Sequence, residues 1–312
     1  MKRTIAEVLR RGFENMVGNW PLLAIRIGES ILMVVIFIVS AIAIIVPFVT
    51  SLWTSRALPS DPGAAAEEIL SALASHWLVF VYALVVVSIV LLVVIAVHSF
   101  VVSGNARVYV DGERKAGTVA MAGRGVFACF SGDRWFAGGR DGWWPVFWIY
   151  NIAWSVAGLI LLVPMVVVLA AMILLRENAA AAFGIGCLGL IVTIVFTILV
   201  IIVTNIWTEK AIVDCLARST GALESLSDSW AEFRSDMGRH LVVAIVMMVV
   251  AFAGSMAFSS FSWMGALSQQ ASPHVMLMPV QFTGSILNSI LSAAVGSWFL
   301  ACFAALAVES RV

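Results

Sequence analysis

The chain has 312 residues, of which 62% are hydrophobic and 12% are charged, and its mean hydropathy is +1.04. Soluble domains carry roughly 25% charged and 45–50% apolar residues, so one soluble core of this size cannot bury so much apolar surface. A lipid bilayer is the natural solvent for it. The formal net charge of zero argues against the basic stripe of a nucleic-acid-binding protein.

Long runs without charge predict six membrane-spanning helices, because crossing the hydrocarbon core takes about 20 apolar residues. Continuous runs favour helices over barrel strands, which are shorter and alternate apolar with polar residues. The last two spans come from one charge-free run, which we expect to break at Ser268–His274 and at Pro279. The expected spans are about 30–49, 77–104, 150–175, 179–207, 240–262 and 283–308.

The ends and connections of these spans predict the topology. The first span follows a charged amphipathic segment and no small-residue cleavage site follows it, so we expect an uncleaved membrane protein without a signal peptide. Nearly all lysines and arginines lie at the two chain ends and in the connections after the second and fourth spans, whereas the opposite side holds Arg56 and Arg176. By the positive-inside rule, we expect a multi-pass protein of a bacterial cytoplasmic (inner) membrane with both termini cytoplasmic.

A weak internal repeat divides the single membrane domain, 1–312, into units of about 1–110, 111–218 and 219–312. Each unit begins with a connecting segment that carries an apolar stripe at three- and four-residue steps, which predicts an amphipathic helix. Glycines interrupt the middle copy. Such helices lie on the membrane surface or pack beneath the spans. The stripes are Ile5, Val8, Leu9, Phe13, Met16, Val17 and Trp20; Val119, Val126, Phe127 and Phe130; and Leu223, Leu226, Trp230, Phe233 and Met237.

Two Trp-Pro pairs, Trp20-Pro21 and Trp144-Pro145, stand where we expect the chain to enter the bilayer. Proline suits a helix start, because the N–H that it lacks would have no partner there. The predicted fold is therefore all-α. It has six transmembrane helices arranged as three helical hairpins, each preceded by a cytoplasmic amphipathic or interfacial helix.

The segment Glu209–His240 carries a motif of the form G-x-x-E-x-L-x-x-S-W, with Gly221, Glu224, Leu226, Ser229 and Trp230 at its fixed positions. We expect Gly221 to permit a chain reversal, Glu224 to face the helix dipole and Trp230 to anchor at the interface. The segment resembles a broad group of uncharacterised bacterial six-helix membrane proteins, which includes the membrane domain fused to some glycerophosphodiester phosphodiesterases. The resemblance implies a fold and a membrane location. It implies no activity, because no soluble block is large enough for the phosphodiesterase domain.

Six polar residues in or near the spans are candidates for function. Arg26 and Glu29 share a helix face and can pair at the mouth of a path through the protein, or sit at the interface with Arg26 snorkelling. His98 has no second intramembrane histidine with which to hold a haem or metal, so helix packing is favoured. Asn288 shares one face of the sixth span with small and hydroxyl residues, which serves either close packing or a polar substrate path. Asn151 and Asn205 can join either arrangement.

No pattern predicts a cofactor, a metal site or a catalytic centre. The four cysteines lie far apart with no metal-ligand spacing. Most of the tryptophans stand at span ends, as in an aromatic belt, although pigment or quinone contacts would use the same rings. We expect a non-enzymatic membrane scaffold, assembly factor or accessory subunit, with membrane lipids and other membrane subunits as partners. A transporter or lipid-handling protein that uses Arg26, Glu29 and the sixth span is the alternative.

Overall fold

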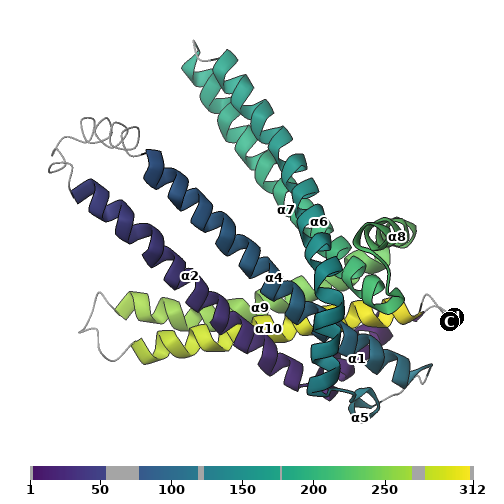
Figure 1. The fold of residues 1–312 in the computed structure, drawn as a ribbon. Helices are drawn as coiled ribbons and strands as arrows, with labels where there is room; N and C mark the ends of the chain where they lie inside the picture. The colour runs from purple at the N-terminus through teal and green to yellow at the C-terminus, as the bar shows by residue number, and fades with distance from the viewer. Residues whose placement is uncertain (1–2, 54–76, 119–122, 176–177, 269–277, 310–312) are drawn as a thin grey trace. The chain divides into compact units, whose positions relative to one another are not determined.

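The computed structural model describes residues 3–53, 77–118, 123–175, 178–268 and 278–309, and all regular secondary structure in these ranges is helical. Six of the described helices are long and apolar enough to span a membrane (Figure 1). The predicted all-α fold is confirmed for the described residues, and six helices have the length and apolar character that the predicted spans require. The helices are α1 (Ile5–Gly18), α2 (Pro21–Trp53), α4 (Trp77–Ala116), α5 (Arg124–Phe127), α6 (Gly132–Leu174), α7 (Ala179–Arg218), α8 (Ala222–Ser235), α9 (Met237–Ser268) and α10 (Met278–Glu309).

The spanning helices are longer than the apolar runs that predict them. Helices α4 and α6 contain 40 and 43 residues, which corresponds to about 60 Å each, roughly twice the hydrocarbon thickness. Helix α4 therefore continues past the expected end of its span, at 104, as far as Ala116. This extension carries charged side chains away from the apolar part of the helix.

Helix starts follow the local capping groups. Pro21 is the first residue of α2, as the sequence predicts, but the matching prediction for Pro145 is wrong, because Pro145 lies inside α6. Ser131 caps α6 instead, and its hydroxyl accepts a hydrogen bond from the Arg134 N–H at 3.3 Å. Of the expected break in the last apolar run, residues 269–277 lie outside the described ranges, while Pro279 lies in the first turn of α10.

The short helix α1 is capped at its start and packs against α10. The Thr4 hydroxyl accepts from the Glu7 N–H at 3.3 Å, and the Glu7 carboxylate accepts from the Thr4 N–H at 2.7 Å. The hydrogen bond from the Thr4 backbone also lowers the pKa of Glu7. Trp298 of α10 donates to the Leu9 carbonyl at 2.8 Å. A Cβ added at Gly12 would lie 2.4 Å from Cys302 Sγ, so glycine permits this close approach.

The chain reverses between α7 and α8 at Ser219, not at Gly221. Ser219 has a φ of 56°, in the left-handed region, and its N–H bonds the Cys215 carbonyl. Gly221 has an ordinary φ of −73°, and a Cβ there would meet nothing within 4 Å. The expectation that Gly221 permits the reversal is therefore wrong, because a serine takes the unusual conformation.

The described residues form two compact units. In the unit Gly28–His98, the hydroxyl of Tyr82 on α4 lies 3.4 Å from the Ala43 carbonyl of α2. In the unit formed by Met1–Ile27 and Ser99–Val312, α6 runs beside α7 and α9 runs beside α10 (Figure 1). Helix α1 packs on α10, and α8 packs on α7.

The apolar core of this larger unit lies at one end of its long helices. In contrast, the most apolar windows of α6 and α7 are only 6% and 0% buried, which is the pattern of helices whose outer faces meet lipid. The core is formed by parts of six helices, with Val8 of α1: α4 between Val101 and Val110, α6 between Val146 and Ala153, α7 between Ile206 and Ala217, α8 between Leu226 and Phe233, α9 between Val243 and Met247, and α10 between Leu300 and Val308.

Candidate functional site

A buried carboxylate, Glu113, joins three helices at the packed end of the larger unit. Its Oε2 accepts from Arg11 Nη2 at 2.8 Å and from Arg3 Nη1 at 3.2 Å. The Glu113 side chain is fully buried and that of Arg11 is 4% exposed. Arg3 also donates to the Ala305 carbonyl of α10 at 3.0 Å. The short helix α1 is thereby tied to the ends of α4 and α10.

A second ion pair extends this Glu113 cluster to α9. Arg239 Nη2 donates to Glu309 Oε2 at 2.6 Å and to the Arg3 carbonyl at 2.7 Å. The Arg3 N–H also donates to Glu309. Four helices, α1, α4, α9 and α10, therefore meet through charged groups that are mostly shielded from solvent. Such charge-assisted hydrogen bonds are about twice as strong as neutral ones.

Two buried asparagines at the end of α1 bond α4 and the connection before α6. Asn15 donates to the Tyr109 carbonyl of α4 at 2.9 Å. Asn19 Oδ1 accepts from the N–H groups of Cys129 and Phe130 at 3.0 and 2.9 Å, and its amide donates to the Phe127 carbonyl at 3.0 Å. Among the described residues of this middle connection, the helical ones are the four of α5. The Asn19 side chain therefore bonds N–H and C=O groups of the connection that have no helical hydrogen bonds.

A third group of charges, the Glu232 cluster, fixes α8 against α7. Lys210 Nζ lies 3.0 Å from Asp214 Oδ2 and 2.5 Å from Glu232 Oε2. Arg218 pairs with Asp228 at 2.7 Å and also with Glu232. Partial burial raises the pKa of Glu232, but the hydrogen bond and charge of Lys210, followed by those of Arg218, outweigh it, so this pKa lies below its ordinary value. Asp228 and Glu232 of α8 are thus neutralised by cations of α7.

A row of aromatic rings links α7, α8, α9 and α10 beside the Glu232 cluster. Trp207 contacts Trp230 with ring centroids 5.4 Å apart, and Trp230 contacts Phe233 at 5.6 Å. The row continues through His240 to Phe303, with centroid distances of 5.9 and 6.1 Å. The indole N–H of Trp207 donates to the Leu226 carbonyl of α8 at 2.8 Å. Apolar contacts and ion pairs therefore act together to hold α8.

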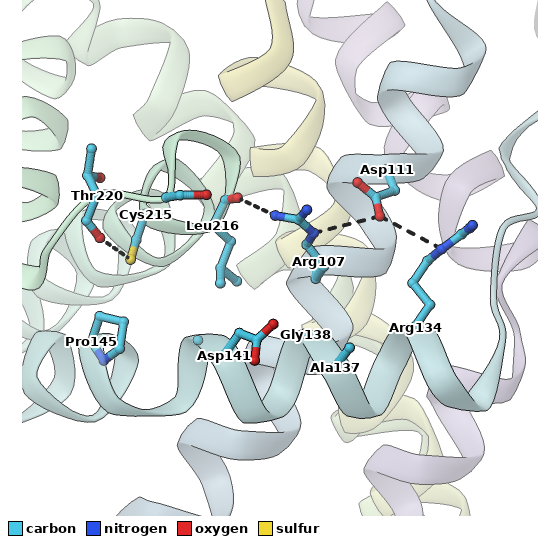
Figure 2. Close-up of a pocket in the computed structure, with 12 residues that line it drawn as sticks. Arg107, Asp111, Arg134, Ala137, Gly138, Asp141, Pro145, Cys215, Leu216 and Thr220 are labelled. Atoms are coloured by element: carbon cyan, nitrogen blue, oxygen red, sulfur yellow. Dashed lines mark hydrogen bonds and ion pairs between the residues drawn. The ribbon is translucent and has the colours of Figure 1, made fainter.

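A polar cleft of about 500 Å³ lies between α4, α6 and the end of α7 (Figure 2). Asp111 stands among three guanidinium groups, 3.7 Å from Arg107, 3.7 Å from Arg114 and 4.0 Å from Arg134. Figure 2 shows Arg107 and Arg134 on either side of this carboxylate. The cleft is lined by Arg107, Asp111, Arg134, Ala137, Gly138, Asp141, Gly142, Pro145, Cys215, Leu216, Ser219 and Thr220.

Backbone oxygens fix the arginines that line the polar cleft. Arg107 donates to the Leu216 carbonyl at 3.0 Å, and Arg134 donates to the Cys129 carbonyl at 2.6 Å. Two arginines and two aspartates give the lining a balanced charge. The lining contains no histidine, and the Cys215 thiol donates to the Thr220 carbonyl at 3.1 Å. The cleft therefore offers charged groups of both signs for binding a polar ligand.

The sequence candidates Glu29 and His98 meet in the structure. In the unit Gly28–His98, His98 Nδ1 lies 2.6 Å from Glu29 Oε1, and the Glu29 side chain is 6% exposed. Arg26 belongs to the other unit and is half-buried there. Its guanidinium lies 3.9 Å from the position of a Cβ added at Gly296 of α10. Arg26 is thus close to the polar face of the sixth span.

The three candidate asparagines lie on different helices. Asn151 of α6 donates to the Phe147 carbonyl of its own helix at 2.7 Å. Asn205 of α7 is exposed. Asn288 of α10 is half-buried, and its buried Oδ1 has no hydrogen-bond partner among the described residues. Each of these amides therefore stands in a different setting.

The motif residues of the connection between the fourth and fifth spans have structural positions in α8. Glu224 lies in its first turn, as predicted. Leu226 and Ser229 are buried, and the Ser229 hydroxyl donates to the Leu226 carbonyl at 3.1 Å. Trp230 is half-buried in the aromatic row. The motif thus supplies the packed face of α8.

The functional sequence analysis missed the residues that form the most buried ion pairs, Glu113, Arg11 and Lys210. A usable signal was present for Lys210 alone, since its four-residue spacing from Asp214 continues the helix beyond the apolar run.

Within the described ranges, no group of three or more histidine, cysteine, aspartate or glutamate side chains is placed to hold a metal ion. Comparisons of the chain with protein-family models, with curated proteins and with solved structures give no match.

Proposed function

We propose that this chain is a non-enzymatic integral membrane protein that serves as a scaffold, assembly factor or accessory subunit of a membrane complex. In this proposal the six spans form three helical hairpins, each preceded by an amphipathic or interfacial helix, in a bacterial cytoplasmic membrane with both termini cytoplasmic. The basic connections support that orientation. The motif in α8 supports a relationship to the six-helix group that includes the phosphodiesterase membrane domain.

The observation that carries the proposal is the set of ion pairs within the protein at the helix ends, together with an open polar cleft. Glu113, Arg239 and Glu232 all have charged partners within the same protein. These pairs fix α1 and α8 to the ends of the long helices, as a rigid binding surface requires. A titratable group used for chemistry would instead face a site with room for a substrate.

The polar cleft is the proposed contact for a partner subunit. Its lining charges, Arg107, Arg134, Asp111 and Asp141, suit a polar segment of a partner protein that carries both signs of charge. The side chain of Asp141 is 69% exposed and is therefore accessible from outside. Complementary charges of this kind set the orientation of a partner more than they set the affinity.

Site-specific photo-crosslinking in intact membranes tests this contact. A crosslinker at Asp141 should trap one partner that also copurifies at a fixed stoichiometry in mild detergent. The matched control is a crosslinker at Glu224, which is exposed on α8 and lies outside the lining of the cleft. Arg134→Glu should abolish the Asp141 adduct. An adduct pattern identical at the two positions, or unchanged by Arg134→Glu, would refute the proposed contact.

Cysteine labelling tests the proposed topology. Ser60 and Ser272 lie outside the described residues and fall in connections expected to face away from the cytoplasm. Single cysteines at these positions should react with a membrane-impermeant reagent from outside the cell. Labelling of either position from the cytoplasmic side alone would contradict the proposed orientation.

Transport is a second candidate, favoured by the contact between Glu29 and His98. Intramembrane carboxylate and histidine pairs often carry protons or ions. If the protein transports a substrate along such a path, flux into liposomes should fall in both Glu29→Gln and Asn288→Ala. Flux that neither substitution changes would eliminate this path.

A further inference from the structure

An apolar groove of about 710 Å³ runs along α6 and α7 and is covered on one side by α8. We call it the α8 groove. Its lining residues are Ile152, Ala153, Val156, Ala157 and Ile160 of α6; Phe196, Leu199, Val200, Val203, Thr204 and Trp207 of α7; and Leu223, Leu226, Ser227, Trp230, Ala231 and Arg234 of α8. Its volume lies within the range of about 300–1,000 Å³ that is typical of small-molecule sites.

The interior of the α8 groove suits hydrocarbon. Most of its walls come from the apolar parts of α6 and α7, and the indole N–H of Trp207 already donates to the Leu226 carbonyl. Water would find few polar partners there. Along α7 the groove extends from Phe196 to Trp207, a length of about 17 Å at 1.5 Å per residue. This length is close to half of the roughly 30 Å hydrocarbon thickness, which is the depth of one leaflet.

A single cation, Arg234, stands among the lining residues that the structure describes, and no carboxylate does. Its guanidinium lies 5.9 Å from the centre of the Trp230 ring. The neighbouring acidic side chains of α8, Asp228 and Glu232, are paired with Arg218 and Lys210. Among the described residues, no acidic side chain forms an ion pair with Arg234. The groove therefore combines an apolar interior with an exposed positive charge.

We propose that the α8 groove binds one anionic phospholipid from the leaflet on the α8 side. One acyl chain lies against α6 and α7, and the phosphate contacts Arg234. Arginine suits this role because its planar fork can hold phosphate oxygens in a bidentate manner. If the positive-inside orientation holds, this leaflet is the cytoplasmic one, whose surface is negatively charged.

The dimensions favour a lipid chain over a transmembrane helix of another subunit. A helix about 10 Å wide and about 30 Å long occupies roughly 2,400 Å³. The groove has about 710 Å³, and α8 forms one of its walls. An acyl chain is narrow and flexible enough to follow such a space. This inference does not depend on the proposed scaffold function.

Native mass spectrometry of the purified full chain in mild detergent tests the acyl-chain part. Dioleoylphosphatidylglycerol is the probe, and Val156→Trp fills the groove from a side chain that is 39% exposed. Val163→Trp is the matched control, because Val163 lies on the same helix, is 63% exposed and does not line the groove. Val156→Trp should lose the bound lipid, whereas Val163→Trp should retain it. Leu199→Trp, from the α7 wall, provides a second groove-filling variant if Val156→Trp does not fold.

Replacement of the cation tests the headgroup part. The wild type should retain phosphatidylglycerol about tenfold better than dioleoylphosphatidylcholine, and Arg234→Gln should remove this preference, as expected for a charge-assisted contact. Arg140→Gln is the control, since Arg140 is exposed and lies outside the groove. Equal lipid retention by both tryptophan variants of α6 would overturn the proposal. So would an unchanged preference in Arg234→Gln, or a dimer of this chain that Val156→Trp dissociates, since the groove would then bind a second copy.

Discussion

Replacing Glu113 with glutamine removes the negative charge where α1, α4 and α10 meet, while the side chain keeps nearly the same size. The fully buried carboxylate accepts three hydrogen bonds through Oε2, two of them from Arg11 at 3.1 and 2.8 Å. Its other oxygen, Oε1, has no hydrogen-bond partner among the described residues. The loss of charge therefore removes the Glu113 carboxylate as a counter-ion of the buried Arg11 guanidinium.

The expected cost follows from the burial of the pair. Breaking a buried ion pair from one side costs about 3–5 kcal/mol, since an uncompensated charge is left behind. The exposed pair Arg140–Asp141, with both side chains 69% exposed, is the matched comparison, and an exposed pair contributes about 0–1 kcal/mol. We therefore expect Glu113→Gln to lower the free energy of unfolding by about 3 kcal/mol or more, and Asp141→Asn by less than about 1 kcal/mol.

Equilibrium unfolding in mixed micelles with an increasing fraction of sodium dodecyl sulfate measures this difference. The double replacement Arg11→Met with Glu113→Leu should recover much of the lost stability, because replacing both partners of a buried pair with apolar groups is often neutral. The coupling between the two positions should then exceed about 1 kcal/mol in a double-mutant cycle. A Glu113→Gln protein as stable as Asp141→Asn, or two additive single replacements, would refute the reasoning.

Three further predictions concern the short helices. The pKa of Glu232 is lowered, so its contribution to the docking of α8 is complete above the ordinary glutamate pKa of 4.5 and is lost as the pH falls through the lower pKa of the folded protein. Hydrogen exchange of residues 222–235 should therefore become faster below pH 4.5, and in Glu232→Gln it should already be faster at neutral pH. Equal protection in all of these samples would contradict this prediction. Gly12→Ala should destabilise the protein by about 1–3 kcal/mol through overpacking, because the new Cβ would lie 2.4 Å from Cys302 Sγ. Gly28→Ala is the control, because a Cβ there would meet nothing within 4 Å. The same micelle titration should give different unfolding midpoints for the two variants, and equal midpoints would contradict the predicted overpacking. Asn19→Ala removes the acceptor of the Cys129 and Phe130 N–H groups and should lower the free energy of unfolding by about 1–3 kcal/mol. Proteolysis between residues 117 and 131 should become faster, and cleavage at the wild-type rate would contradict this prediction.

The spans could be predicted from the sequence because hydrophobicity acts locally. A run such as 179–207 predicts a membrane-spanning helix from its own composition, without information about any distant residue. The helix ends were harder to predict, since a helix does not have to stop where the hydrocarbon stops. Helix α4 continues through Arg107 and Asp111, whose spacing of four residues itself favours helix. Ser131 likewise outweighs Pro145 as the start of α6, because its hydroxyl satisfies a free N–H group.

The polar clusters could not be predicted, because their members come from distant parts of the chain. Glu113 meets a residue 102 positions away, and Arg3 meets one 306 positions away. Nothing near Glu113 in the sequence marks it as buried. The candidates Arg26 and Glu29 lie close to an apolar run in the sequence, whereas most of the buried charges in the structure lie in the connections and helix extensions. These charged residues are buried because they form ion pairs with other helices, and their distance from the apolar runs does not predict this pairing.

The contact between α1 and α10 has a consequence for how the protein is made. Leu9 bonds a tryptophan 289 residues later in the chain, and ribosomes add about 5–20 residues per second. The apolar stripe of the first helix must then wait about 15–60 s for its final neighbour. During that interval a nascent chain needs a temporary cover, and the surface of the bilayer into which it is being inserted is the nearest one available.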